Sequence, residues 1–210
     1  MERLPAVLAL SELARYRLGD GMDYRPIRKP MGVSAFGINA YTGANAGDEV
    51  IEDHDEQGDG SGHHEELYVV MTGHAGFVLD GEAVDAPAGT LVFVRPEQRR
   101  AATALAEDTT VLVIGGKPGA AGPPSPFEYW YLAEPEYAAG NYARAYEITA
   151  EGLAEYPVNP NLNYQLACYA ALDGRSEQAL EHLNFAFEKR PESREWAKTD
   201  SDLDSIRSSF

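Results

Sequence analysis

The chain has 210 residues, 44% of them hydrophobic, and its 34 acidic and 17 basic side chains give a formal net charge of −17. This composition is typical of a globular protein with one good hydrophobic core or two small ones. The negative charge repels polyphosphate backbones and anionic bilayers, so we expect neither a nucleic acid nor a membrane as partner. The single cysteine, Cys168, cannot form a disulfide within the chain, and we expect a cytoplasmic protein.

The first 30 residues are predicted to form a helix and a connector. Residues 6–16 have the pattern of a short amphipathic helix, and the opening lacks the apolar run and the small-residue cleavage site of a signal peptide. The segment GDGMDYRPIRKP that follows is rich in turn residues and positive charge. It indicates a connector or an edge strand.

The segment EELYVVMTGHAGFVLDGE, residues 65–82, predicts β-structure. Its apolar runs are rich in valine and aromatic residues, and the Asp80-Gly81 pair is a strong signal for a hairpin turn. Side chains alternate along a strand, so Glu66, Tyr68 and Val70 are expected on one face. A carboxylate at the head of an otherwise apolar face marks the first candidate for a functional site.

Residues 31–116 have the pattern of an all-β sandwich or barrel. Short apolar strands follow one another at close spacing between glycine-containing turns. One interruption, DHDEQGDGSGHH at residues 53–64, is a polar loop with three histidines and several acids. The segment KPGAAGPPSP, residues 117–126, is a Pro/Gly linker that is expected to separate two domains.

Residues 127–210 have helical periodicity and contain an internal repeat. Three pairs of identical residues recur at a spacing of 34 positions: Gly140 and Gly174, Ala145 and Ala179, and Pro157 and Pro191. This region resembles the tetratricopeptide repeat, in which small residues lie where two antiparallel helices cross. The first copy departs from the pattern at Gly152 and at Pro135, which is expected to interrupt its first helix. The resemblance implies that the repeats bind a protein partner or brace a dimer.

The β region resembles the cupin superfamily. The resemblance rests on HEELYVVMTG, on the DG hairpin and on APAGTLVFVRP, and it covers about residues 31–116. It implies an α+β chain in which a small antiparallel barrel precedes the helical module, and a homodimer. It also implies a divalent metal held by two histidines and a glutamate of the first motif and one histidine of the second. Glu66 occupies the glutamate position, whereas a simple alignment leaves the other three positions without histidines.

A looser alignment, with GDGSG as an insertion, supplies a ligand set. His54 becomes the first ligand, His64 or Glu56 the second and Glu66 the third, a set that suits Zn, Fe, Mn or Ni. The simpler interpretation is that these histidines belong to a solvated acidic loop.

A buried ion pair is the rival to a metal site. Arg99 and Arg100 stand where a cupin places its last ligand, and an arginine there repels a cation and favours an anionic ligand or a pair with Glu66. Alternation places only one of the two inside, and the sequence does not decide which. The candidate ligand pocket therefore consists of Glu66, Tyr68, Phe93 and Arg100.

Two functions remain open, and the sequence leaves undecided whether the chain is an enzyme. The favoured hypothesis is a non-catalytic barrel that binds a small molecule, with an anion as one option, fused to repeats that bind a protein partner or brace a dimer. The alternative is a metal-dependent cupin enzyme, an oxygenase or isomerase acting on a small organic substrate. In that case His54, His64 and Glu66 would hold the metal and Tyr68 would donate a proton.

Overall fold

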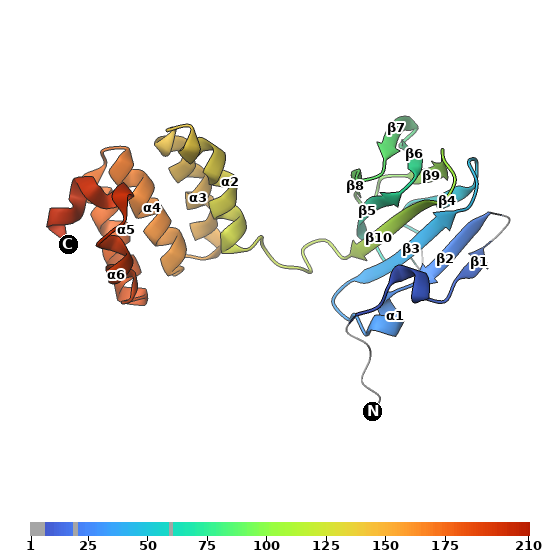
Figure 1. Cartoon of the computed structure of the whole chain (residues 1–210), viewed down its shortest axis with the longest axis horizontal. Helices are drawn as coiled ribbons and strands as arrows, with labels where there is room; N and C mark the ends of the chain where they lie inside the picture. Colours follow the sequence, from blue (N-terminus) through green and yellow to red (C-terminus); the bar gives the residue numbers. More distant parts are fainter. Residues whose placement is uncertain (1–6, 19–20, 59–60) are drawn as a thin grey trace, which may run out of the picture. The chain divides into compact units, whose positions relative to one another are not determined.

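The computed structural model describes residues 7–18, 21–58 and 61–210, and it has mixed α+β architecture (Figure 1). The chain divides into two compact units, Met1–Ala121 and Gly122–Phe210. The first unit holds all the strands, and the second is helical. None of the helices in the described residues combines the length and apolar character that are needed to cross a bilayer.

The first unit contains two antiparallel sheets. The larger sheet has the order β1-β2-β3-β10-β5-β8, with strands Tyr16–Leu18, Met22–Pro26, Gly37–Gly43, Thr109–Gly116, Glu65–Thr72 and Leu91–Val94. The smaller sheet has the order β4-β9-β6-β7, with strands Glu49–His54, Arg100–Ala104, His74–Leu79 and Glu82–Pro87. Both central residues of the turn between β6 and β7, Asp80 and Gly81, have positive φ, which confirms the predicted hairpin.

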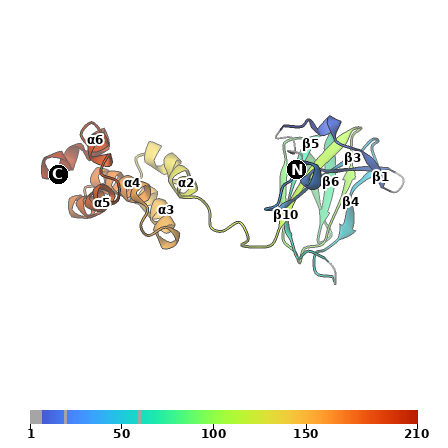
Figure 2. The ribbon, with the colours of Figure 1, turned by 90° about the horizontal axis from the view of Figure 1, so that it is seen from below.

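The hydrophobic core of this unit lies between the two sheets. Its buried side chains come from both, among them Tyr68 and Val70 of β5 and Phe77 of β6. Within the described residues no ladder joins one sheet to the other, so the unit is a two-sheet sandwich (Figure 2). The expected closed barrel is therefore not observed, although the alternation of buried and exposed positions that suggested it is present.

The predicted N-terminal helix was wrong over most of its length, whereas the strand alternative for the segment after it is confirmed by β2. Only Leu10–Glu12 forms a helical turn, of 3-10 type, and β1 pairs with β2 over the segment expected to end the helix and form the connector. The first residue of that predicted helix, residue 6, lies outside the described residues. Arg15 bonds the carboxylate of Asp23, which is only 4% exposed, and this pairing allows a charged residue within β2. The sheet thus begins at Tyr16 rather than at residue 31.

The second unit consists of helices arranged as two consecutive pairs. The first pair is α2 Pro126–Ala138 with α3 Tyr142–Glu155, and the second is α4 Pro160–Leu172 with α5 Ser176–Lys189. The short helix α6 Ser193–Ala197 and the 3-10 helix η2 Ser201–Ser209 follow them. α2 and α4 begin 34 residues apart, as do α3 and α5, so the sequence period is also a structural one. Gly140 and Gly174 end the first helix of each pair with φ values of 78° and 77°. Pro135 lies within α2 and does not end it, contrary to expectation.

Candidate functional site

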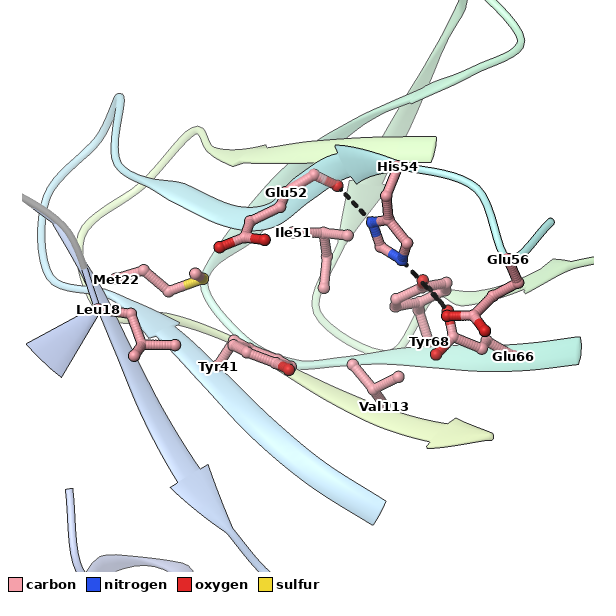
Figure 3. A pocket seen from close by; sticks show the side chains of 10 residues that line it. All are labelled: Leu18, Met22, Tyr41, Ile51, Glu52, His54, Glu56, Glu66, Tyr68 and Val113. Carbon is pink, nitrogen blue, oxygen red and sulfur yellow. Dashed lines mark hydrogen bonds and ion pairs between the residues drawn. The ribbon is translucent and has the colours of Figure 1, made fainter. Parts of the chain in front are cut away.

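A pocket of about 290 Å³ opens beside the inner face of the larger sheet (Figure 3). Its lining comes from both sheets and consists of Leu18, Met22, Tyr41, Ile51, Glu52, His54, Glu56, Glu66, Tyr68 and Val113. The polar side chains of His54, Glu56 and Glu66 gather at one end, whereas Leu18 and Met22 lie at the other, with the carboxylate of Glu52 beside Met22. The pocket is therefore amphipathic, and its size suits a small organic molecule.

Glu66, Tyr68 and Arg100 form a hydrogen-bonded network at the polar end. Arg100, from β9, is fully buried, and its NH2 lies 3.0 Å from Oε2 of Glu66. Its Nε donates to the hydroxyl of Tyr68 at 3.2 Å, and that hydroxyl donates to the same oxygen of Glu66. The expected alternation along β5 places Glu66 and Tyr68 together, and the register of β9 brings Arg100 to them. The predicted rival to a metal site, a buried Glu66–Arg pair, is present.

The network fixes the protonation of its members. Burial raises the pKa of Tyr68 well above its usual value, and the charge of Glu66 raises it further, so the phenol remains protonated at neutral pH. Burial alone would lower the pKa of Arg100, but its bonds to Tyr68 and Glu66 outweigh burial and raise it. The network thus places a cationic guanidinium and a neutral phenol beside the Glu66 side chain.

Arg100 supports the pocket from behind. Its NH1 donates to the backbone oxygen of Gln98 at 2.9 Å, so all three guanidinium nitrogens have acceptors within the protein. The pocket lining does not include Arg100, contrary to its prediction as a ligand-pocket residue. Arg99 lies outside, where it forms a two-point ion pair with Asp53 at 2.7 and 3.0 Å.

Three potential metal ligands meet at the same end of the pocket. One atom each of His54, Glu56 and Glu66 lies within 4.8 Å of the others. Nδ1 of His54 lies 2.7 Å from the backbone oxygen of Glu52, which assigns the ring proton to Nδ1. In the neutral form of this tautomer the lone pair is on Nε2, which lies 3.9 Å from Oε2 of Glu66. A backbone carbonyl orienting one imidazole nitrogen is a common arrangement behind histidines that bind metals.

His64 does not belong to this cluster. The second ligand position is taken by Glu56, the alternative that the sequence left open, whose Oε2 accepts from the backbone N–H of Gly62 at 2.8 Å. His64 lines a neighbouring cavity instead. The predicted set of His54, His64 and Glu66 is thus replaced by a set of one imidazole and two carboxylates.

Phe93 was placed in the ligand pocket by prediction and lies outside it. Val92 and Val94 point into the core, so Phe93 lies on the opposite face of β8 and is 51% exposed. The alternation within β8 does not reveal which of its two faces is inward. That choice follows from the pairing of Phe93 with Leu67, an outward residue of β5, which the sequence alone does not show.

Sequence reasoning missed Tyr41, Glu52 and Met22. Tyr41 comes from β3, and burial raises its pKa to about 12. Met22 comes from β2, in a segment read as a connector or edge strand. Residue spacing along the sequence does not connect β2 or β3 with the β5 motif. Met22 lies in the pocket because β2 pairs with β3, and this pairing is visible only in the structure.

The electrostatics of the pocket disfavour an anion. Glu52, Glu56 and Glu66 line it, whereas Arg100 is buried and committed to protein acceptors. A ligand in this pocket therefore meets carboxylate oxygens and the phenol of Tyr41. These groups suit a cation or hydroxyl groups, and the expectation of an anionic ligand, which assumed an exposed arginine, is corrected here.

The comparisons with known proteins are limited to structural similarity at low identity. No family model matches the chain, and no curated sequence relative matches it. A cupin protein from Bacteroides fragilis is 20% identical, with 60% of this chain and 93% of that chain covered at a TM-score of 0.42. KdgF from Halomonas is 16% identical, with 50% and 86% covered at 0.42. A sugar phosphate isomerase of a cupin superfamily from Silicibacter pomeroyi is 18% identical, with 53% and 75% covered at 0.43. At these values the similarities transfer neither a family nor an activity to this chain.

Proposed function

We propose that the unit Met1–Ala121 binds a small organic molecule in this pocket without chemically changing it. The observation that carries the proposal is the Glu66–Tyr68–Arg100 network at the polar end of the pocket. Every hydrogen bond that described residues make to the Glu66 carboxylate falls on Oε2, so Oε1 remains to accept from a hydroxyl or ammonium group. Because buried partners hold the acceptor in place, little order is lost when a ligand binds.

The apolar end of the pocket adds a second requirement. Leu18 and Met22 offer no hydrogen bonds, so the part of the ligand that contacts them is a short hydrocarbon or ring face, and the Glu52 carboxylate lies beside Met22 (Figure 3). The favoured ligand class is therefore a small amphipathic molecule with at least one hydroxyl or amino group.

The test is a thermal-shift screen of polyols, amines and sugars, followed by calorimetry on each hit. Replacing Glu66 with Gln is expected to weaken binding by about tenfold or more, because the charged acceptor is lost. Glu65→Gln is the matched control, since Glu65 is on the same strand but on its outer face. Equal weakening by both variants, or no hit with the wild-type chain, would refute the proposal.

A metal-dependent enzyme is the second candidate, and the cluster of His54, Glu56 and Glu66 favours it. These residues offer the ligand types that a divalent transition ion takes, since one imidazole nitrogen and two carboxylates lie within 4.8 Å of one another. Bound there, such an ion would act as a Lewis acid on a substrate oxygen. Arg100 opposes this use, because its positive charge lies 3.0 Å from a ligand oxygen of Glu66.

Metal analysis of protein expressed with Zn, Fe, Mn and Ni supplied separates the two candidates. The enzyme hypothesis expects about one ion per chain and its loss in Glu56→Gln. His74→Ala serves as the control, because His74 pairs with Asp85 outside the cluster. Absence of stoichiometric metal, or retention of the metal in Glu56→Gln, would reject the second candidate.

For the helical unit we propose tetratricopeptide-like binding of a protein segment. The proposal is supported by the two helix pairs 34 residues apart, with Ala145 and Ala179 fully buried at equivalent positions. Pull-down with the full chain and with a chain ending at residue 121 tests it. The same partner recovered equally by both chains would exclude a role for the helices.

A further inference from the structure

A second cavity, of about 620 Å³, adjoins the first. Its lining comes from β2, β3, β5, β10, the helix α1 (Arg28–Met31) and the loops beside them, and includes Tyr24, Arg28, Lys29, Asn39, His64 and Glu66. Glu66 and Val113 line both cavities. The Glu66 side chain therefore borders both cavities, and a molecule in the second cavity can contact it as well as one in the first.

The second cavity has the opposite charge to the first. Arg28 and Lys29 line it side by side, and Glu66 is its only acidic lining residue among those described. Within residues 7–18, 21–58 and 61–210, neither cation forms a salt bridge. Arg28 makes only long bonds, of 3.3 and 3.5 Å, to the backbone oxygens of Val33 and Ser34. Both side chains are exposed, and in a chain with twice as many acidic as basic side chains two cations that line one cavity without carboxylate partners favour an anion there.

A neutral donor completes the set. The hydroxyl of Tyr24 donates to Oδ1 of Asn39 at 2.9 Å, which orients the amide and leaves its Nδ2 hydrogens for an acceptor. The amide and the two cations come from α1 and the neighbouring strand β3. An anionic group among them would receive both charge and directed hydrogen bonds.

Two facing glycines line the second cavity close to Glu66. Gly37 and Gly115 are paired in the β3–β10 register, and both line the second cavity. A Cβ at Gly115 would lie 3.4 Å from Cγ and Oε1 of Glu66, and one at Gly37 would lie 3.3 Å from the oxygen of Gly115. A larger side chain at either position would fill part of the second cavity near Glu66.

We infer that Arg28, Lys29 and Asn39 bind the carboxylate or phosphate group of a small molecule whose hydroxyl or amino group reaches Glu66. The anion site itself stands on the second cavity, and the bifunctional ligand rests on the function proposed above. The sequence offered Arg100 as the residue that would bind an anion. In the inferred arrangement the anion is bound in the second cavity, at α1 and β3, and not by Arg100. It narrows the ligand class to hydroxylated or aminated organic acids and phosphate esters.

Inorganic phosphate and acetate are the probes, each titrated into the full-length protein while backbone amide resonances are followed by NMR. We expect saturable shifts at Gly37, Asn39 and Gly115, and the tighter of the two probes identifies the anion. The double variant Arg28→Gln/Lys29→Gln should weaken that binding by about tenfold or more. Arg95→Gln/Lys117→Gln removes the same charge from exposed positions that line neither cavity, and should weaken it by about twofold at most.

Three outcomes would overturn the inference: no saturable shift with either probe, shifts confined to other residues, or equal weakening in both double variants. Failure of the anion site is distinguishable from failure of the proposed function, because phosphate and acetate lack the hydroxyl or amino group on an organic scaffold that the first pocket is proposed to bind. If phosphate or acetate binds but the polyol and amine screen gives no hit, the anion site is supported and the proposed function of the first pocket is refuted. A hit in that screen without probe binding removes only the anion site.

Discussion

The guanidinium of Arg100 lies 3.0 Å from Oε2 of Glu66, and the arginine is fully buried while 13% of the glutamate side chain remains exposed. The charge pair is therefore asymmetric: solvent and ligand reach only the acid. Tyr68, protonated at neutral pH, bridges the two. The arginine thus neutralises the carboxylate from behind, while Oε1 of the carboxylate remains available to the pocket.

Removal of Arg100 is expected to destabilise the sheet unit strongly. Arg100→Met leaves Glu66 without a counter-charge and should lower the free energy of unfolding by about 3–5 kcal/mol. The double variant Arg100→Met/Glu66→Gln should recover a large part of this loss, since no buried charge is left unpaired. Both tryptophans lie in the helical unit, so amide hydrogen exchange of β5 and β9 is the appropriate measurement. A double variant as unstable as the single one would show that packing, not charge, holds Arg100.

The outer face of the larger sheet predicts a dimer. Leu91 and Phe93 of β8 are 64% and 51% exposed, and they pair with Val69 and Leu67 of β5. Glu65 and Arg95 bear opposite charges at the end of this face, so two copies could meet there without the repulsion that a net charge of −17 produces elsewhere. We expect Leu91→Glu to raise the dimer dissociation constant by about tenfold or more in analytical ultracentrifugation.

Leu105→Glu is the control for this prediction. Leu105 is 51% exposed and lies outside the β8 and β5 strands, so the same charge introduced there should leave the dissociation constant unchanged. A wild-type chain that stays monomeric at all concentrations would refute the dimer.

Much of this site was accessible from the sequence, and the exceptions share one cause. Alternation along β5 correctly joined Glu66 and Tyr68, because strand periodicity is a local property. The errors at Phe93 and Met22 arose where the answer depends on which strands pair and in what register. Such pairing is decided by contacts between residues far apart in the chain, and a single sequence does not display them.

In the helical repeat, too, the local features were predicted correctly and the effect of tertiary packing was not. Its period and its turn glycines were visible in the sequence because each helix pair is built from local contacts. The effect of Pro135 was mispredicted, since α2 continues through it to Ala138. Proline removes one backbone bond and crowds the preceding turn, a loss that packing of α2 against α3 outweighs.

Stability of the helical unit is expected to decrease in mild acid because of His182. Its ring nitrogens bond Asn163 and Tyr146, each at 2.8 Å, and burial lowers its pKa from 6.5. As the pH falls through 6.5, the unfolded chain therefore binds a proton that the native chain does not, and the free energy of unfolding falls. Glu181 partly opposes this shift, and Arg175 adds to it.

Urea unfolding followed by tryptophan fluorescence between about pH 7.5 and about pH 5 measures this effect. His182→Gln should flatten the pH dependence, whereas His74→Gln, in the other unit, should leave it unchanged. Burial raises the pKa of Asp202 from 3.8, which has the opposite sign but acts at lower pH. An equally steep dependence in His182→Gln and the wild type would contradict the assignment.

Gly152 is the position where the repeat pattern and the packing disagree. It stands where the second copy has Ala186, so the pattern favours Gly152→Ala, and helix propensity would add about 1 kcal/mol of stability. A methyl group there would lie 2.9 Å from Cγ of Tyr129 and from Cδ1 of Leu162. The Leu162 side chain can adopt another rotamer. Cγ of Tyr129 is bonded directly to Cβ, so it cannot move away unless the backbone of α2 shifts.

We expect the clash to outweigh propensity and Gly152→Ala to be destabilising, by about 1–2 kcal/mol in tryptophan-monitored urea unfolding. The double variant Gly152→Ala/Tyr129→Ala should relieve the clash, so Gly152→Ala should cost less in the Tyr129→Ala chain than in the wild type. The same cost in both backgrounds would show that Tyr129 is not the obstacle. A single Gly152→Ala variant more stable than the wild type would mean that α2 and α3 can separate enough to accept the repeat's usual alanine.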